Sequence, residues 1–241
     1  MKLAPLLLLT SPVALALAQE ALPTRFGVVL FTAFQALDVF GPLDVLNTFS
    51  FQQKNITLSL LSRTLSPVST VPITMGTTFG ESIVPTHTFD APPSNLEVLI
   101  VPGGAGTRAP DLTKEIDFIR AAFPSLKYVI AVCTGNALIA RAGLLDGKRA
   151  TGNKKSWSWV TSQGNKTHWV AKARWVRSSE KIWSTSGVSS GVDGVLNFVE
   201  TIYGEAVATD LAHGIEWRRV TDPDDDEFAA IWGAKDVPPL E

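Results

Sequence analysis

The feature that most constrains this chain is an alternation of short, continuous apolar runs with longer segments of helical periodicity. RFGVVLF (25–31), EVLIV (97–101) and YVIAV (128–132) are typical of strands buried on both faces of a sheet. Segments with apolar residues at helical spacing lie between and after them, at 38–49, 112–123 and 137–145. This order predicts a mostly parallel sheet covered by helices on both faces, which is an α/β fold.

The rest of the chain continues the pattern without an internal repeat or a long linker. We expect a hairpin or edge excursion in the Thr-, Gly- and Pro-rich stretch 71–89. Further strands are predicted at 56–61, 169–176 and 182–185, and further helices at 192–203 and 205–213. We therefore predict a single domain over residues 19–241.

The first 18 residues have the pattern of a secretory signal peptide. A basic Lys2 precedes an apolar run that ends in the small-residue site Ala16-Leu17-Ala18. Ser11-Pro12 interrupts this run well short of the roughly 20 apolar residues that a membrane anchor needs. The sequons at Asn55 and Asn165 fit a secreted glycoprotein. We expect secretion, and no association with a membrane.

Composition excludes several classes of function. The chain has 21 Lys+Arg and 23 Asp+Glu, so its net charge of −2 provides no electrostatic surface for nucleic acid. A single cysteine excludes an intramolecular disulfide framework and zinc or iron–sulfur sites built from several thiolates. The three histidines are widely scattered, and the acidic run DPDDDE (222–227) lacks the glycine and the spaced glutamate of an EF-hand. We expect no metal, a solvated turn at 222–227, and tryptophans that pack in the core.

Two glycine-rich turns match well-known motifs only in part. GAGTRA (104–109) fits a loose dinucleotide-binding pattern, but Pro110 interrupts it and the next predicted strand ends in Cys133 rather than in an acidic residue. GVSSG (187–191) fits the serine-hydrolase elbow, but only His213 follows Ser189, with no room for the remaining triad elements. We expect Ser189 and Ser190 to cap the following helix instead.

The third turn, VCTGN (132–136), provides the leading candidate nucleophile. A buried strand leads directly into Cys133, and a helix begins almost at once. The amides and dipole of a helix N-terminus favour a thiolate there and bind a developing oxyanion, as does the Gly103-Gly104 turn after a neighbouring strand. A nucleophile also needs a proton partner. Asp38 follows another parallel strand and has two open interpretations, as that partner or as a first-turn acid stabilising its helix dipole.

Taken together, these stretches resemble the ThiJ/PfpI superfamily, which has the class I glutamine-amidotransferase-like fold, and within it the isonitrile (isocyanide) hydratase-like branch. The resemblance implies a Rossmann- or flavodoxin-like three-layer sandwich, a nucleophile-elbow cysteine at Cys133 and, usually, a homodimer. It implies an acid at Asp38 that hydrogen-bonds the cysteine, a positioning role for Thr134, and oxyanion or substrate contacts at Gly103, Gly104 and the Thr134 amide. The matching stretches are ALDVFGPLDVL (36–46), LIVPGGAGT (99–107), AVCTGNALIARAGLLDGKRAT (131–151), STSGVSSGVD (184–193) and DPDDDEF (222–228).

One position departs from many relatives. Where those relatives have a histidine about twenty residues after the cysteine, this chain has Asn153, which we expect to be an oxyanion or substrate contact like Gly103 and Gly104. A neutral amide cannot act as a general base, so functions that depend on a Cys–His pair are disfavoured. The resemblance to the hydratase branch rests on an acid and a cysteine and is affected less.

The leading hypothesis is therefore an isonitrile hydratase-like lyase that needs no cofactor and acts on a small molecule. Cys133 would form a thioimidate, and water would release an N-substituted formamide. One alternative is a glyoxalase- or deglycase-like enzyme that acts on reactive carbonyls. The other is a secreted, non-catalytic binding or redox-responsive protein in which Cys133 is oxidised.

Overall fold

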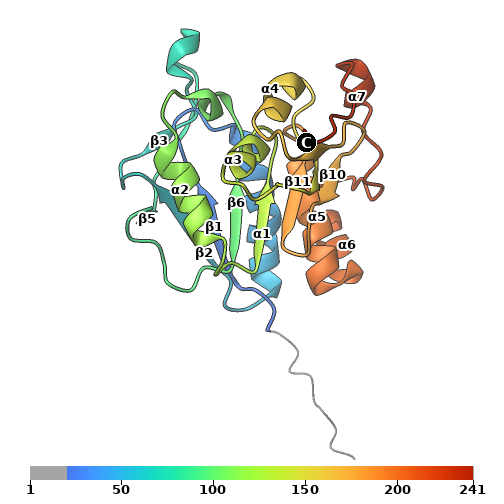
Figure 1. The fold of residues 1–241 in the computed structure, drawn as a ribbon. Helices are drawn as coiled ribbons and strands as arrows, with labels where there is room; N and C mark the ends of the chain where they lie inside the picture. The colour runs from blue at the N-terminus through green and yellow to red at the C-terminus, as the bar shows by residue number, and fades with distance from the viewer. Residues whose placement is uncertain (1–20, 241) are drawn as a thin grey trace, which may run out of the picture.

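The protein is described by a computed structural model over residues 21–240, and the predicted signal segment lies outside the described residues. Its centre is a seven-stranded sheet in the order β10-β11-β7-β6-β1-β2-β5 (Figure 1). All pairings in this sheet are parallel except that of β10 with β11. The strands are β1 (Arg25–Val29), β2 (Thr57–Ser62), β5 (His87–Thr88), β6 (Val98–Val101), β7 (Tyr128–Ala131), β10 (Trp175–Arg177) and β11 (Ile182–Thr185).

Helices cover both faces of the sheet, which gives three layers (Figure 1). One face carries α2 (Thr113–Ala122) and α3 (Gly135–Arg141), and the other carries α1 (Ala36–Gln52), α5 (Ser190–Tyr203) and α6 (Glu205–Gly214). Because both faces are covered, every residue of β6 and β11 is buried. The predicted α/β three-layer fold with a mostly parallel sheet is confirmed.

Smaller elements lie at the margins of the sandwich. The stretch 71–89, predicted as a hairpin or edge excursion, contains β4 (Ser82–Ile83), which pairs antiparallel with β3 (Val68–Ser69) just before the stretch, and β5 at the sheet edge. A second pair joins β8 (Arg149–Ala150) to β9 (His168–Trp169). The short helices are η1 (Ile73–Met75), η2 (Ala105–Arg108), α4 (Trp157–Ser162) and α7 (Phe228–Ile231).

Three local predictions were wrong in part. The strand predicted over 169–176 is broken into β9 and β10, because the Ala171 amide donates to the Asp236 side chain instead of to a neighbouring strand. Trp157, Trp169, Trp175 and Trp183 pack in the core as predicted, whereas Trp232 is half exposed. The acidic run is exposed as predicted at Asp222, Asp224 and Asp225, but Asp226 is buried by its contact with Lys154.

None of the helices within residues 21–240 has the length and apolar character needed to span a membrane.

Candidate active site

The candidate site lies where the parallel strands end. Since β1, β6, β7 and β11 run in the same direction, the segments that follow them meet at one edge of the sheet. Those segments carry Asp38, the Gly103-Gly104 turn, Cys133 and the turn at Gly187. Residues far apart in sequence are thereby brought to one place.

Cys133 sits at a tight strand-to-helix turn with a φ of 60°, an unusual conformation for a residue with a side chain. Its amide donates to the Ser186 carbonyl at 2.9 Å, which fixes the turn against the end of β11. The Asn136 side chain donates to the Cys133 carbonyl at 3.0 Å and to the Thr185 carbonyl at 2.8 Å. These bonds hold the strained turn in place, and the free thiol is buried at its apex.

Asp38 lies in the first turn of α1 and is fully buried. Its Oδ2 accepts a 2.8 Å hydrogen bond from the Gly103 amide, and its Oδ1 has no hydrogen-bond partner among the described residues. Burial raises the pKa of Asp38 from 3.8 to about 7, and the Gly103 amide and the Cys133 thiol offset only part of that effect. A carboxyl group that titrates near neutral pH beside a thiol is suited to move protons. The role of Asp38 as the proton partner of Cys133 stays a prediction.

The thiol itself differs from the sequence expectation of a thiolate. Burial, followed by the neighbouring Asp38 charge, raises the pKa of Cys133 from 9.0 to about 12. The amides of Val188 and Thr134 and the side chain of Asn153 oppose this shift without reversing it. A raised pKa favours the neutral thiol, so nucleophilic attack by Cys133 requires a nearby base that takes its proton.

Thr134 and the two glycines form one compact hydrogen-bonded unit. The Gly104 amide donates to Thr134 Oγ1 at 2.9 Å, and Thr107 Oγ1 donates to the same oxygen at 3.1 Å. A Cβ on Gly103 would lie 2.5 Å from the Thr134 amide nitrogen and 2.9 Å from Asp38 Oδ2, so only glycine fits this approach. Both glycine amides are engaged, one with the acid and one with Thr134. Their role as oxyanion donors stays a prediction.

Asn153 contacts the thiol directly, at the position where many relatives carry a histidine. Its Nδ2 donates to Cys133 Sγ at 3.2 Å, and its Oδ1 accepts from the Ser156 amide at 2.9 Å. The second bond fixes the side-chain amide with its donor toward the sulfur. Asn153 can stabilise charge that develops on Sγ, but it cannot remove a proton.

A pocket of about 190 Å³ lies beside these groups. Asn153, the turn from Ser186 to Ser189 and the lysines at 154 and 155 form part of its lining, and the aromatic side chains of Phe228 and Trp232 complete it. A larger hollow of about 590 Å³ beside α2 contacts none of the predicted site residues. The smaller pocket is the candidate substrate site because it adjoins the thiol's hydrogen-bond partners.

The other sequence-predicted residues have varied surroundings. Ser189 is at the N-cap position of α5 without a side-chain capping bond, whereas the Ser190 hydroxyl donates to the Gly187 carbonyl at 2.6 Å. Asn55 and Asn165 are exposed. Sequence reasoning missed Asn136, Val188 and Lys154, of which only Asn136 is signalled by its place immediately after the Cys-Thr-Gly turn.

Within residues 21–240 there is no group of three or more His, Cys, Asp or Glu side chains that could hold a metal ion.

Comparisons with known proteins agree with this arrangement. The model of the DJ-1/PfpI family matches residues 24–203. An isonitrile hydratase from Pseudomonas putida is 34% identical over 182 residues, which cover 75% of this chain and 72% of that protein. Both findings bear out the predicted superfamily and its isonitrile hydratase-like branch.

Solved structures show the same fold. A THiJ/PfpI family protein from Pseudomonas syringae superposes with a TM-score of 0.68 at 24% identity, over 86% of this chain and 82% of its own. Drosophila melanogaster DJ-1beta superposes with a TM-score of 0.66 at 16% identity, over 81% of this chain and 100% of its own. The fold, the cysteine at its elbow and the family match lead to one conclusion: this chain belongs to the DJ-1/PfpI family.

Proposed function

We propose that the protein hydrates isonitriles, converting R–N≡C and water to an N-substituted formamide. The observation that carries the proposal is the pairing of a buried Cys133 with a buried Asp38, whose pKa of about 7 suits proton transfer, and with Asn153 in place of a histidine. Such a site has a nucleophile and one proton carrier. The similarity to the Pseudomonas putida isonitrile hydratase supports the same reaction.

The first half of the reaction adds the thiol across the terminal carbon. Asp38, as carboxylate, takes the thiol proton while Sγ of Cys133 bonds to that carbon. Asp38 then delivers the proton to the same carbon, which gives the thioimidate R–N=CH–S–Cys133. Asn153 Nδ2 stabilises negative charge on the sulfur as the proton leaves.

The second half adds water. Asp38 takes a proton from the attacking water and delivers it to the imidate nitrogen, while the water oxygen bonds to carbon, so that the adduct R–NH–CH(OH)–S–Cys133 forms. Breaking the C–S bond releases R–NH–CHO, and the hydroxyl proton of the adduct passes to Sγ of Cys133. In this scheme Thr134 Oγ1 accepts a hydrogen bond from the Gly104 amide and so fixes the Gly103-Gly104 turn. The Gly103 amide of that turn then orients Asp38.

The test is to incubate purified protein with n-butyl isonitrile and to follow N-butylformamide by proton NMR. We expect turnover in the wild type, and loss of at least a hundredfold in Cys133→Ala and Asp38→Asn. No formamide, or a rate that Cys133→Ala does not change, would refute the proposal. Methylglyoxal in a parallel reaction tests the carbonyl alternative, and a stable Cys133 sulfinate without either activity would favour the non-catalytic one.

We further propose that the protein works as a homodimer. Large apolar side chains at the start of α1 and on β2 are exposed, namely Leu37, Phe40 and Leu58 at 39–40%. They line a shallow hollow of about 510 Å³ together with Ile83 and Trp217. An exposed apolar patch of this kind is typical of an association surface. Light scattering should give twice the chain mass, and Phe40→Glu should give the monomer.

Secretion remains a proposal that rests on the signal-like N-terminus and on the exposure of both sequon asparagines. Expression of the full chain in a eukaryotic host should yield mature protein in the medium. Its mass should fall on treatment with an N-glycosidase, and Asn55→Gln and Asn165→Gln should each remove one glycan.

A further inference from the structure

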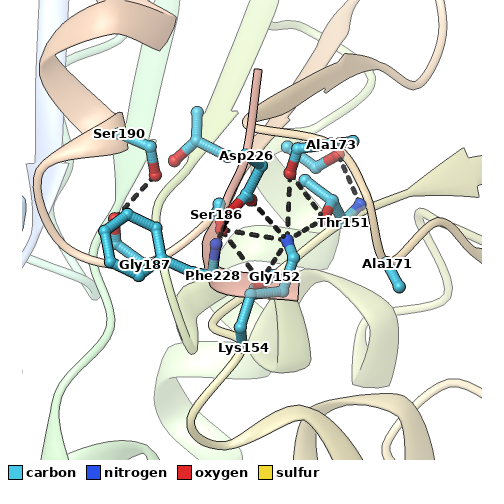
Figure 2. A network of polar contacts seen from close by, with 12 residues as sticks. Thr151, Gly152, Lys154, Ala171, Ala173, Ser186, Gly187, Ser190, Asp226 and Phe228 are labelled. Atoms are coloured by element: carbon cyan, nitrogen blue, oxygen red, sulfur yellow. Dashed lines mark hydrogen bonds and ion pairs between the residues drawn. The ribbon is translucent and has the colours of Figure 1, made fainter. Parts of the chain in front are cut away.

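The molecule carries a buried lysine that the proposed chemistry does not use. The Lys154 side chain is 1% exposed, and its Nζ lies 3.1 Å from Oδ2 of Asp226, whose side chain is 0% exposed. Nζ also donates to Thr151 Oγ1, the carbonyls of Gly152 and Ala173, and Ser186 Oγ, at 2.7 to 3.1 Å (Figure 2). A charged ammonium is stable in the interior only with such a set of partners.

The partners of Lys154 come from the parts of the chain that surround the thiol. Gly152 adjoins Asn153, whose side-chain amide donates a hydrogen bond to Cys133 Sγ. The Ser186 carbonyl accepts a hydrogen bond from the Cys133 amide, and this bond fixes the strand-to-helix turn. The ammonium therefore contacts the Asn153 loop directly at Gly152, and it reaches the turn at Cys133 through Ser186.

Asp226 connects Lys154 to the C-terminal segment, defined here as residues 222–237. Its Oδ1 accepts a 2.9 Å bond from the Phe228 amide, so the carboxylate also fixes the start of α7. Phe228 and Trp232 extend from this segment into the lining of the pocket. Figure 2 shows the Phe228 ring near Gly187, another pocket residue, and the Lys154–Asp226 pair to the right of the ring.

We propose that Lys154 is a positioning residue for Cys133: through Asp226 it joins the Asn153 loop to the C-terminal segment, and so holds the thiol's amide donor and the aromatic pocket wall in one arrangement. The inference rests on Cys133 being the reactive group of the proposed function. It does not depend on which electrophile Cys133 attacks.

The electrostatics of the pair fit this role. The pKa of Lys154 is lowered from 10.5 to about 8, chiefly because the side chain is buried; the nearby Arg174 charge contributes to this lowering, whereas Asp226 opposes it. Asp226 is thus the group that keeps the ammonium charged. Arg174 forms its own buried pair with Asp193 at 2.7 Å, and its backbone amide donates to the Pro223 carbonyl, so this backbone bond also anchors the C-terminal segment. Loss of one charge should loosen the segment without unfolding the sheet.

The test uses Asp226→Asn, because the asparagine oxygen can still accept from the Phe228 amide, whereas the NH2 group takes the place of the charged oxygen that faces Lys154. Asp225→Asn is the matched control, since it makes the same change at the adjacent, exposed position. Lys154→Met is the more severe variant, because it leaves Asp226 and several other acceptors without their donor.

The first readout is alkylation of the single cysteine, followed by intact mass. Iodoacetamide and N-phenyl-iodoacetamide react with the same thiolate, so the ratio of their rates does not depend on the thiol pKa and reports on the pocket wall. We expect the wild-type ratio to exceed that of N-acetylcysteine. In Asp226→Asn it should fall at least threefold toward the N-acetylcysteine value, while Asp225→Asn keeps the wild-type ratio.

The second readout is hydrogen–deuterium exchange. In Asp226→Asn we expect exchange at least fivefold faster both in residues 151–156 and in residues 226–232, with the central strands unchanged. A wild-type ratio and wild-type exchange in Asp226→Asn, or equal effects from Asp225→Asn, would overturn the inference. Failure of both reagents to label native Cys133 would also overturn it, because the pocket must reach the thiol. Absence of isonitrile turnover would refute only the proposed function, since neither readout uses that reaction.

Discussion

The burial of Asp38 predicts a specific dependence of stability on pH. Raising the pKa of a carboxyl group on folding favours its protonated form in the folded protein, so its contribution to stability is complete below its unfolded pKa and is lost as pH rises through the folded pKa. For Asp38 that window runs from 3.8 to about 7. At about 1.4 kcal/mol for each pH unit, the ionised carboxylate lowers the free energy of unfolding by about 4 kcal/mol above pH 7.

Asp38→Asn should remove this dependence. The amide oxygen can accept the Gly103 amide bond that Oδ2 accepts now, and the side chain stays neutral at every pH. Between pH 5 and 7.5 the wild type should lose about 2.5 kcal/mol more of its free energy of unfolding than the variant does. Urea unfolding at both pH values measures the difference. Asp44→Asn, an exposed position on the same helix, is the control and should behave as the wild type.

The same experiment can refute the account of the site. If Asp38→Asn and the wild type lose the same free energy of unfolding between pH 5 and 7.5, Asp38 does not carry a raised pKa. Proton transfer to and from Cys133 at neutral pH would then need another group. A variant that is less stable than the wild type at pH 7.5 would likewise contradict the burial of an ionised carboxylate there.

Three further variants test the surroundings of the thiol. Asn153→Ala removes the 3.2 Å donor to Cys133 Sγ, and since one such bond is worth about 1 kcal/mol, alkylation by iodoacetamide at pH 8 should slow about fivefold; unchanged alkylation would exclude the amide from stabilising the thiolate. Gly103→Ala places a Cβ 2.5 Å from the Thr134 amide nitrogen, so it should lower the melting temperature and should reduce formamide production at least tenfold; wild-type values of both would contradict the close approach. Thr134→Val leaves the Gly104 amide without its acceptor, so in urea unfolding this variant should be less stable than the wild type by about 1–3 kcal/mol, while Thr134→Ser should be close to the wild type. Equal losses in the two variants would show that the Thr134 hydroxyl does not stabilise the turn.

Much of the fold follows from local sequence. The apolar runs at 25–31, 97–101 and 128–132 coincide with β1, β6 and β7 within a residue or two, because strands buried on both faces need uninterrupted apolar side chains. The break between β9 and β10 does not follow, since it depends on a side chain far along the chain, Asp236, that takes the Ala171 amide. Local pattern cannot reveal such a competitor for a backbone donor.

The candidate site likewise has features that the sequence predicts and features that only the fold reveals. Cys133 and Asp38 could be proposed from their places after parallel strands, because strand ends gather at one edge. The protonation state of the thiol could not be predicted from the sequence. A helix N-terminus favours a thiolate, whereas burial raises the pKa of the thiol, and the extent of burial cannot be read from the sequence. Asp226 looked like one more member of a solvated acidic run, and only the fold brings it to Lys154.

The central claim is that Cys133 forms a covalent adduct with an isonitrile on the way to a formamide. The most direct measurement mixes the protein with an equimolar ¹³C-labelled isonitrile at pH 7 and follows intact mass and ¹³C NMR together over a single turnover. The account predicts a transient species heavier by the mass of the isonitrile, located on Cys133, which decays as labelled formamide appears and is absent in Cys133→Ala. Formamide production by Cys133→Ala, or an adduct that never releases formamide, would contradict it.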